Sequence, residues 1–132
     1  MLSHALSRPC LEVCGLLGES GGLIKSYYPV DNIAERQERA FLMEPAGQLA
    51  ALRCMRENGE IMAGIFHSHP NTPARPSVRD RREARYAHIY YFIASLQQTT
   101  PEIKTFYFDG NEFQDVPISI DREENHYTGS GL

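Results

Sequence analysis

The sequence has few cysteines, only two lysines and no tryptophan, and it contains no long apolar run. Its three cysteines, Cys10, Cys14 and Cys54, are an odd number and form no Cys-x-x-Cys pair. This argues against a disulfide framework and against a four-cysteine zinc site, and it favours a reducing cytoplasm. No apolar stretch approaches the length of a membrane span, and residues 1–10 lack the apolar core of a signal peptide.

Positive charge is also scarce, since 13 basic residues face 17 acidic ones and the net charge is −4. A protein that binds nucleic acid or an anionic membrane is usually basic, so the charge argues against both partners. The chain has 132 residues, 42% of them hydrophobic, which is enough for one domain with a real core. Because such a domain needs no structural metal to fold, a bound metal would serve chemistry.

The apolar pattern predicts a single α/β domain over residues 1–132, with a mostly β sheet and two good helices. Strands are expected at 12–18, 23–30, 60–67, 89–96, 103–110 and 112–120, with a short one at 39–44. The last two long strands should form a hairpin that turns at Asp109-Gly110. One helix should begin at Pro45 and stop at Gly59, and a second should begin near Ser77. Residues 121–132 are expected to be a flexible tail.

The segment that carries chemistry is HSHPNTPARPSVRD, residues 67–80. Because side chains alternate along a strand, His67 and His69 should share one face with their Cα atoms roughly 6.5 Å apart, and Ser68 should point the other way. Two imidazoles at this spacing can converge on one zinc ion, about 2 Å from each nitrogen. The alternative is a pair of hydrogen-bonded histidines at a strand end.

Two further residues of this segment have a recognisable spacing. Ser77 is a natural helix N-cap and Asp80 falls on the first helical turn, so a capping box is predicted, with Asp in the place usual for Glu. A cap also fixes the backbone, which can aim Asp80 back at the histidines. Two imidazoles and a carboxylate are the protein ligands of an open catalytic zinc site, in which the pKa of water falls to about 7.

Glu12 is the only early acidic residue in an apolar strand context, LEVCGLLG. A carboxylate in such a setting is costly unless it is paired or functional. Glu12 is therefore the candidate base for the proton of the attacking water. The local sequence alone favours the alternative, a solvated carboxylate at the end of a strand.

The order His-Ser-His-Pro, then Ser77 and Asp80, resembles the His-x-His-x7-Ser-x2-Asp signature of the JAMM (MPN-plus) metalloproteases. Glu12, just before Gly-Leu-Leu, occupies the place of that family's catalytic Glu. The likeness covers about residues 10–120. It implies a three-layer α/β/α sandwich with a curved mixed sheet, similar to that of cytidine deaminases.

The resemblance also implies roles for these residues. His67, His69 and Asp80 would bind one Zn²⁺ per chain, and Glu12 would pass the water's proton to the leaving amine. Ser77 would stabilise the oxyanion. The reaction would be hydrolysis of a peptide or isopeptide bond, commonly after the Gly-Gly end of a ubiquitin-like protein.

The chain departs from the larger family members in two ways. Residues 1–9 can make at most a short turn or two, which could expose the first strand. There is no room for the long insertions with which specialised deubiquitinases hold two linked ubiquitins. The chain is more similar to small stand-alone bacterial members, whose partners are sulfur carriers of the ThiS/MoaD fold with a Gly-Gly end. A zinc hydrolase of cell-wall or phage-tail peptides and a non-catalytic scaffold remain as alternatives.

Five arginines accompany the proposed metal ligands, at positions 75, 79, 81, 82 and 85. They form either a solvated helix face, partly paired with Glu83, or an electropositive rim that docks an acidic carrier or a terminal carboxylate. In the second case Arg75, Arg79 and Arg82 are the candidate substrate-binding residues.

Overall fold

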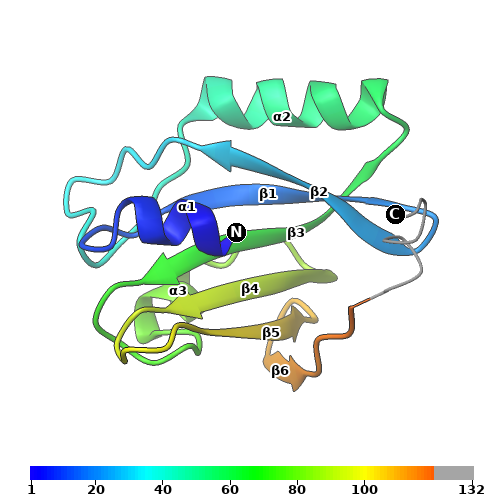
Figure 1. Cartoon of the computed structure of the whole chain (residues 1–132). Helices are drawn as coiled ribbons and strands as arrows, with labels where there is room; N and C mark the ends of the chain where they lie inside the picture. The colour runs from blue at the N-terminus through cyan, green and yellow to red at the C-terminus, as the bar shows by residue number, and fades with distance from the viewer. Residues whose placement is uncertain (121–132) are drawn as a thin grey trace, which may run out of the picture.

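The computed structural model describes residues 1–120, which form a six-stranded mixed sheet with three helices (Figure 1). The strands are β1 (Cys14–Ser20), β2 (Leu23–Val30), β3 (Ile61–His69), β4 (Ile89–Ser95), β5 (Glu102–Phe108) and β6 (Phe113–Val116). The helices are α1 (Leu2–Ser7), α2 (Pro45–Glu57) and α3 (Val78–Glu83). The strand order is β2-β1-β3-β4-β5-β6, and β3 runs parallel to β4 while the other neighbours are antiparallel. The predicted tail, 121–132, lies outside the described residues.

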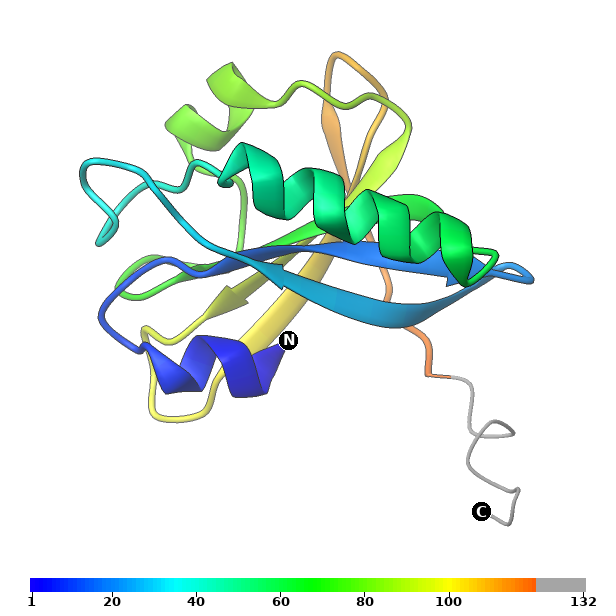
Figure 2. The same cartoon turned by 90° about the horizontal axis from the view of Figure 1, so that it is seen from above.

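The helices cover both faces of the twisted sheet, with α2 and α3 on one side and α1 on the other (Figure 2). Successive residues of β3 show how the layers are filled. Ile65 packs in one core cluster with Met55 of α2, whereas Phe66 packs in another with Ala5 of α1. Because neighbouring side chains of a strand point to opposite faces, one strand joins both cores. The predicted three-layer α/β/α architecture with a mixed sheet is confirmed.

The N-terminal helix covers the first strand, so the expected exposure of this strand is wrong. β1 lies between β2 and β3, and its residues from Cys14 to Gly18 are buried. Ala5 of α1 is fully buried in one cluster with Val13 and Leu17.

The expected strand at 39–44 is also wrong, because a side chain takes part of the backbone hydrogen bonding that a strand would need. Its link to the preceding segment is a single bridge between Asn32 and Met43. The amide of Asn32 donates to the carbonyl of Ala40 and accepts from the N–H of Leu42. A side chain that satisfies backbone groups in this way competes with a sheet ladder.

The two predicted helices follow their sequence signals to different extents. α2 begins with Pro45 as predicted, and Gly59 ends the turn after it in the left-handed region at φ 70°. α3 starts after Ser77 as predicted but is only six residues long, because Ala84 is already extended at ψ 124°. The hairpin of β5 and β6 turns through Asp109–Glu112, and β6 ends at Val116, short of the expected 120. Within residues 1–120 no helix is long and apolar enough to cross a membrane.

Candidate metal centre

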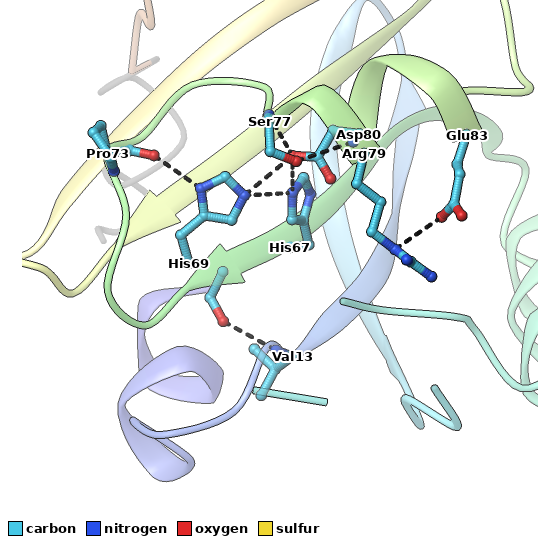
Figure 3. Close-up of polar contacts among 9 residues, drawn as sticks. Val13, His67, His69, Pro73, Ser77, Arg79, Asp80 and Glu83 are labelled. Carbon is cyan, nitrogen blue, oxygen red and sulfur yellow. Dashed lines mark hydrogen bonds and ion pairs between the residues drawn. The ribbon is translucent and has the colours of Figure 1, made fainter. Parts of the chain in front are cut away.

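Three side-chain donor atoms meet where β3 ends and α3 begins (Figure 3). The atoms are Nε2 of His67, Nε2 of His69 and Oδ2 of Asp80, and each lies 3.1 Å from the other two. Both imidazoles are buried and point to the same face of β3. Asp80 reaches them from the first turn of α3. The structure thus brings together the three residues that the sequence predicts as metal ligands.

A capping box holds Asp80 in this position. The backbone N–H of Asp80 donates to Ser77 Oγ at 3.0 Å, and the N–H of Ser77 donates to Asp80 Oδ2 at 2.9 Å. This oxygen is the one that faces both histidines. The helix cap and the donor cluster therefore share one carboxylate oxygen. The hydroxyl of exposed Ser77 accepts in this box and keeps its own hydrogen for a further partner.

A hydrogen bond to the proline-rich loop fixes the ring of His69. Nδ1 of His69 lies 2.8 Å from the carbonyl oxygen of Pro73. A carbonyl only accepts, so Nδ1 carries the hydrogen and Nε2 of the neutral ring presents a lone pair to the cluster. His67 is oriented differently: its ring stacks on Phe41, and its buried Nδ1 has no hydrogen-bond partner within residues 1–120.

Glu12 is a fourth polar group at the cluster, in the segment between α1 and β1. It is only 6% exposed, and one of its carboxylate oxygens lies within 4.8 Å of ring nitrogens of both His67 and His69. In the described part of the chain, its Oε1 atom has no hydrogen-bond partner. Burial raises the pKa of Glu12 to about 8. The expected alternative, a solvated strand-end carboxylate, does not fit this environment.

The two carboxyl groups of the cluster differ in charge state. Burial opposes ionisation of Asp80, but attraction to His67 and hydrogen bonds from both histidines and the Ser77 N–H hold its pKa well below the ordinary value. Burial lowers the pKa of His67. For His69, burial is outweighed by hydrogen bonds to Asp80 and Pro73, so its pKa is raised. Asp80 is therefore a fixed anion, whereas Glu12 titrates close to neutral pH.

The donor set fits a zinc ion. Nitrogen and oxygen ligands of tetrahedral zinc, about 2.0–2.1 Å from the metal, lie roughly 3.3–3.4 Å from one another. The 3.1 Å separations are close to that value. When His69 is neutral, its Nε2 and Asp80 Oδ2 are both acceptors and repel each other, and this contact then needs a cation between them, either a proton on His69 or a metal ion. A shared cation removes this repulsion, and the buried oxygen of Glu12 supplies a further carboxylate beside it.

A cavity of about 420 Å³ opens beside the donor atoms. His67 and Asp80 line it together with apolar and aromatic side chains and four charged ones. The apolar walls include Phe41, Leu42, Met43, Ile65 and Tyr91, and the charged residues are Glu35, Arg79, Glu83 and Arg85. The cleft thus presents apolar walls and charges of both signs beside the donor atoms.

The predicted substrate-binding arginines do not all lie at this cleft. Arg79 lines it and forms an i,i+4 ion pair with Glu83 at 3.3 Å. Arg75 lines a second cavity, in which Arg81 and Lys104 also take part. Arg82 is exposed and lines neither of these two cavities.

The family follows from a comparison with protein-family models. The model described as prokaryotic homologs of the JAB domain matches residues 1–109. The chain belongs to this family. The match confirms the JAMM-type resemblance of the sequence, and the matched residues include the buried donor cluster.

Named relatives of this prokaryotic JAB chain support the assignment. It is 30% identical to a Haloferax volcanii protein named desampylase, over 92% of this chain and 89% of that protein. It is 26% identical to the CysO-cysteine peptidase of Mycobacterium tuberculosis, over 91% of this chain and 84% of that protein. The solution structure of a Desulfitobacterium hafniense protein matches with a TM-score of 0.80 and 38% identity, over 92% and 86% of the two chains.

Two contributors to the cluster are not predicted by the sequence. Phe41 lies 26 positions before His67, and no periodicity links them. The carbonyl of Pro73 is a backbone group, and the prolines around it indicate only a stiff loop. Both contacts depend on how the loops pack.

Proposed function

We propose that this JAB-family chain is a zinc metallopeptidase that cleaves the peptide or isopeptide bond after the C-terminal Gly-Gly of a ubiquitin-like or sulfur-carrier protein. The observation that carries the proposal is the convergence of His67 Nε2, His69 Nε2 and Asp80 Oδ2, each 3.1 Å from the other two in a buried site. The relatives' names, desampylase and CysO-cysteine peptidase, support a peptidase activity of this class.

In this proposal His67, His69 and Asp80 hold one Zn²⁺ per chain. Asp80 is the better carboxylate ligand for two reasons. Its Oδ2 lies 3.1 Å from Nε2 of both imidazoles, whereas the Glu12 oxygen lies only within 4.8 Å of their ring nitrogens, and the pKa of Asp80 is lowered. Bound zinc supplies a Lewis acid for the scissile carbonyl and lowers the pKa of water to about 7.

Glu12 acts as the general base and then as the general acid. Its carboxyl faces both histidines, carries an unpartnered oxygen and has a pKa raised by burial to about 8. A group that titrates near neutral pH can take the proton of the attacking water and return it to the leaving amine. The hydroxyl of Ser77, at the mouth of the same site, keeps a hydrogen for the developing oxyanion.

The cleft beside the donor atoms is the proposed place for the substrate tail. Its apolar walls suit an extended chain end, and Arg79 adds positive charge at the rim. Arg75 and Arg82 lie further out and would act by attraction of an acidic carrier surface. We place the reaction in the cytoplasm, since all three cysteines are free thiols and two of them are exposed.

The test is a metal assay joined to an activity assay. Purified protein should hold one zinc per chain and should trim a sulfur-carrier protein extended past Gly-Gly. Asp80→Ala should lose both zinc and activity, and the exposed Asp115→Ala should keep both. Full zinc in a His67→Ala, His69→Ala double variant would reject the proposed ligand set. Zinc binding without cleavage of any extended carrier would reject the proposed substrate.

A further inference from the structure

Glu12 lies outside the sheet, and a loop carbonyl and a side chain, rather than a strand ladder, fix its backbone. β1 begins only at Cys14. The N–H of Glu12 donates to the carbonyl of Gln37 at 2.7 Å, and its carbonyl accepts from Asn32 Nδ2 at 2.9 Å. Because the carboxyl Oε1 has no partner within residues 1–120, the aim of this side chain depends on its backbone.

Ser68, between the two histidines, replaces one bond of the ladder with its hydroxyl. Cys14 pairs with His67, so the next pair in register is Val13 with Ser68. The N–H of Ser68 donates to the Val13 carbonyl at 3.1 Å, as in a regular antiparallel pair. The N–H of Val13, however, donates to Ser68 Oγ at 3.0 Å (Figure 3), and this hydroxyl also donates to the carbonyl of Leu11 at 3.5 Å. One buried hydroxyl therefore holds the residues on both sides of Glu12.

Asn32 joins Glu12 to the loop that packs on His67. Its Nδ2 donates to the carbonyls of Glu12 and Ala40, both at 2.9 Å. Its Oδ1 accepts from the N–H groups of Ala34 and Leu42 at 2.9 and 3.0 Å. Both donors and both acceptor positions of this amide thus bond to backbone groups around Glu12 and Phe41.

We propose that Ser68 and Asn32 are positioning residues that fix the backbone of Glu12 and so aim its carboxyl at the two histidines. The inference rests on the proposed role of Glu12 as the base. The physical reason is that proton transfer requires a fixed distance, and a misplacement of about 1 Å can lower a rate roughly 10²-fold. Ser68 ties the base to the strand that carries both histidines, so that base and ligands move as one unit.

The first experiment measures amide hydrogen exchange in the metal-free protein, and it does not depend on any activity. In Ser68→Ala the Val13 N–H loses its acceptor, so its exchange should quicken roughly 10-fold or more, while amides inside β1 keep their protection. Ser68→Thr keeps a hydroxyl and should restore the protection. Ser26→Ala is the matched control, because it removes a hydroxyl of β2 that donates to Glu60. It should leave the exchange rate of the Val13 N–H unchanged. Unchanged exchange of Val13 in Ser68→Ala would overturn the proposal.

The second experiment measures kinetics on the extended carrier. Ser68→Ala should lower kcat about 10–100-fold, as loss of an orienting partner does, with KM and zinc content unchanged. Ser68→Thr should recover most of the rate. Asn32→Asp should act like Ser68→Ala, because it keeps the two acceptor bonds but loses both donors. The exposed Asn111→Asp makes the same chemical change away from the site and should leave kcat unchanged.

A double variant separates positioning from general loss of stability. With Glu12→Gln in place there is no base left to aim, so adding Ser68→Ala should lower the residual rate no further. A further loss equal to that in the parent would overturn the proposal, since it would mean that Ser68 acts only on the fold. If Glu12→Gln kept full activity, the proposed function would fail, while the exchange result would still test the backbone contact. Asn32→Asp keeps the proposal testable if Ser68→Ala does not fold.

Discussion

The ring of Phe41 lies almost flat on the ring of His67, with centroids 4.5 Å apart and planes inclined by 25°. His69, in contrast, is held by a hydrogen bond from Nδ1 to Pro73. The two histidines of the donor cluster are therefore oriented by different forces, one by stacking and the other by a hydrogen bond. A histidine whose second nitrogen has no partner within residues 1–120 depends on its packing.

Phe41→Ala should therefore weaken zinc binding. Without the stacked ring, the imidazole of His67 can turn away from the cluster, and loss of an orienting partner typically costs about 10–100-fold in metal affinity. The measurement is zinc competition against a chromophoric chelator. Leu42→Ala, at the exposed neighbouring residue, is the control and should bind zinc like the parent. A Phe41→Ala variant with parent affinity would show that stacking does not orient the ligand.

Glu12→Gln should keep zinc and lose turnover. The amide preserves the shape of the side chain but cannot accept a proton, and general acid–base catalysis is worth about 10²–10⁴-fold. Turnover on the extended carrier and zinc content are measured on the same sample. Retention of most of the activity would exclude Glu12 as the base.

The same residue predicts how the stability of the metal-free protein depends on pH. Burial raises the pKa of Glu12 from 4.5 to about 8. Between these values the folded protein retains a proton that the unfolded chain has released, so the free energy of unfolding falls as pH rises through this window. Glu12→Gln lacks this contribution and should gain stability relative to the parent from pH 5 to pH 8. Urea unfolding at both pH values tests this, with exposed Glu57→Gln as the control. Parallel profiles of parent and Glu12→Gln would contradict the raised pKa.

Arg79 should matter more than Arg82 for a protein substrate. Arg79 lines the cleft with His67 and Asp80, whereas Arg82 does not. We expect Arg79→Glu to lower kcat/KM on an acidic carrier more than Arg82→Glu, which makes the same charge change. The difference should shrink with added salt, because the Debye length falls from about 10 Å at 0.1 M to about 3 Å at 1 M. Activity on a short neutral peptide should change little. If kcat/KM depended on salt in the same way for the parent and both variants, the arginines would form only a solvated helix face.

Gly15→Ala should destabilise the fold. A Cβ at this position would overlap a ring carbon of Tyr27 and lie 2.5 Å from the carbonyl oxygen of Tyr28. The backbone of β2 must move to admit it, and overpacking of this kind costs typically about 1–3 kcal/mol. Urea unfolding of the two proteins measures the change. A parent-like midpoint would contradict the close approach of β1 and β2.

Local sequence rules were sufficient for the part of the site that is local. The alternation of a strand predicts that His67 and His69 share a face, and the Ser77-x-x-Asp80 spacing predicts the capping box. Both depend only on residues a few positions apart. The start of α2 at Pro45 and its stop at Gly59 follow from the same kind of rule.

Tertiary structure alone decided how the remaining parts meet. The bond from Val13 to Ser68 spans 55 positions and that from Asn32 to Glu12 spans 20, and no pattern in the sequence encodes either pair. For the same reason residues 39–44, strand-like in composition, form a loop: the side chain of Asn32, from outside the segment, bonds to the backbone of Ala40 and Leu42. Periodicity and capping are properties of neighbouring residues. The aim of Glu12 and the packing of Phe41 on His67 depend on contacts that exist only once the chain has folded.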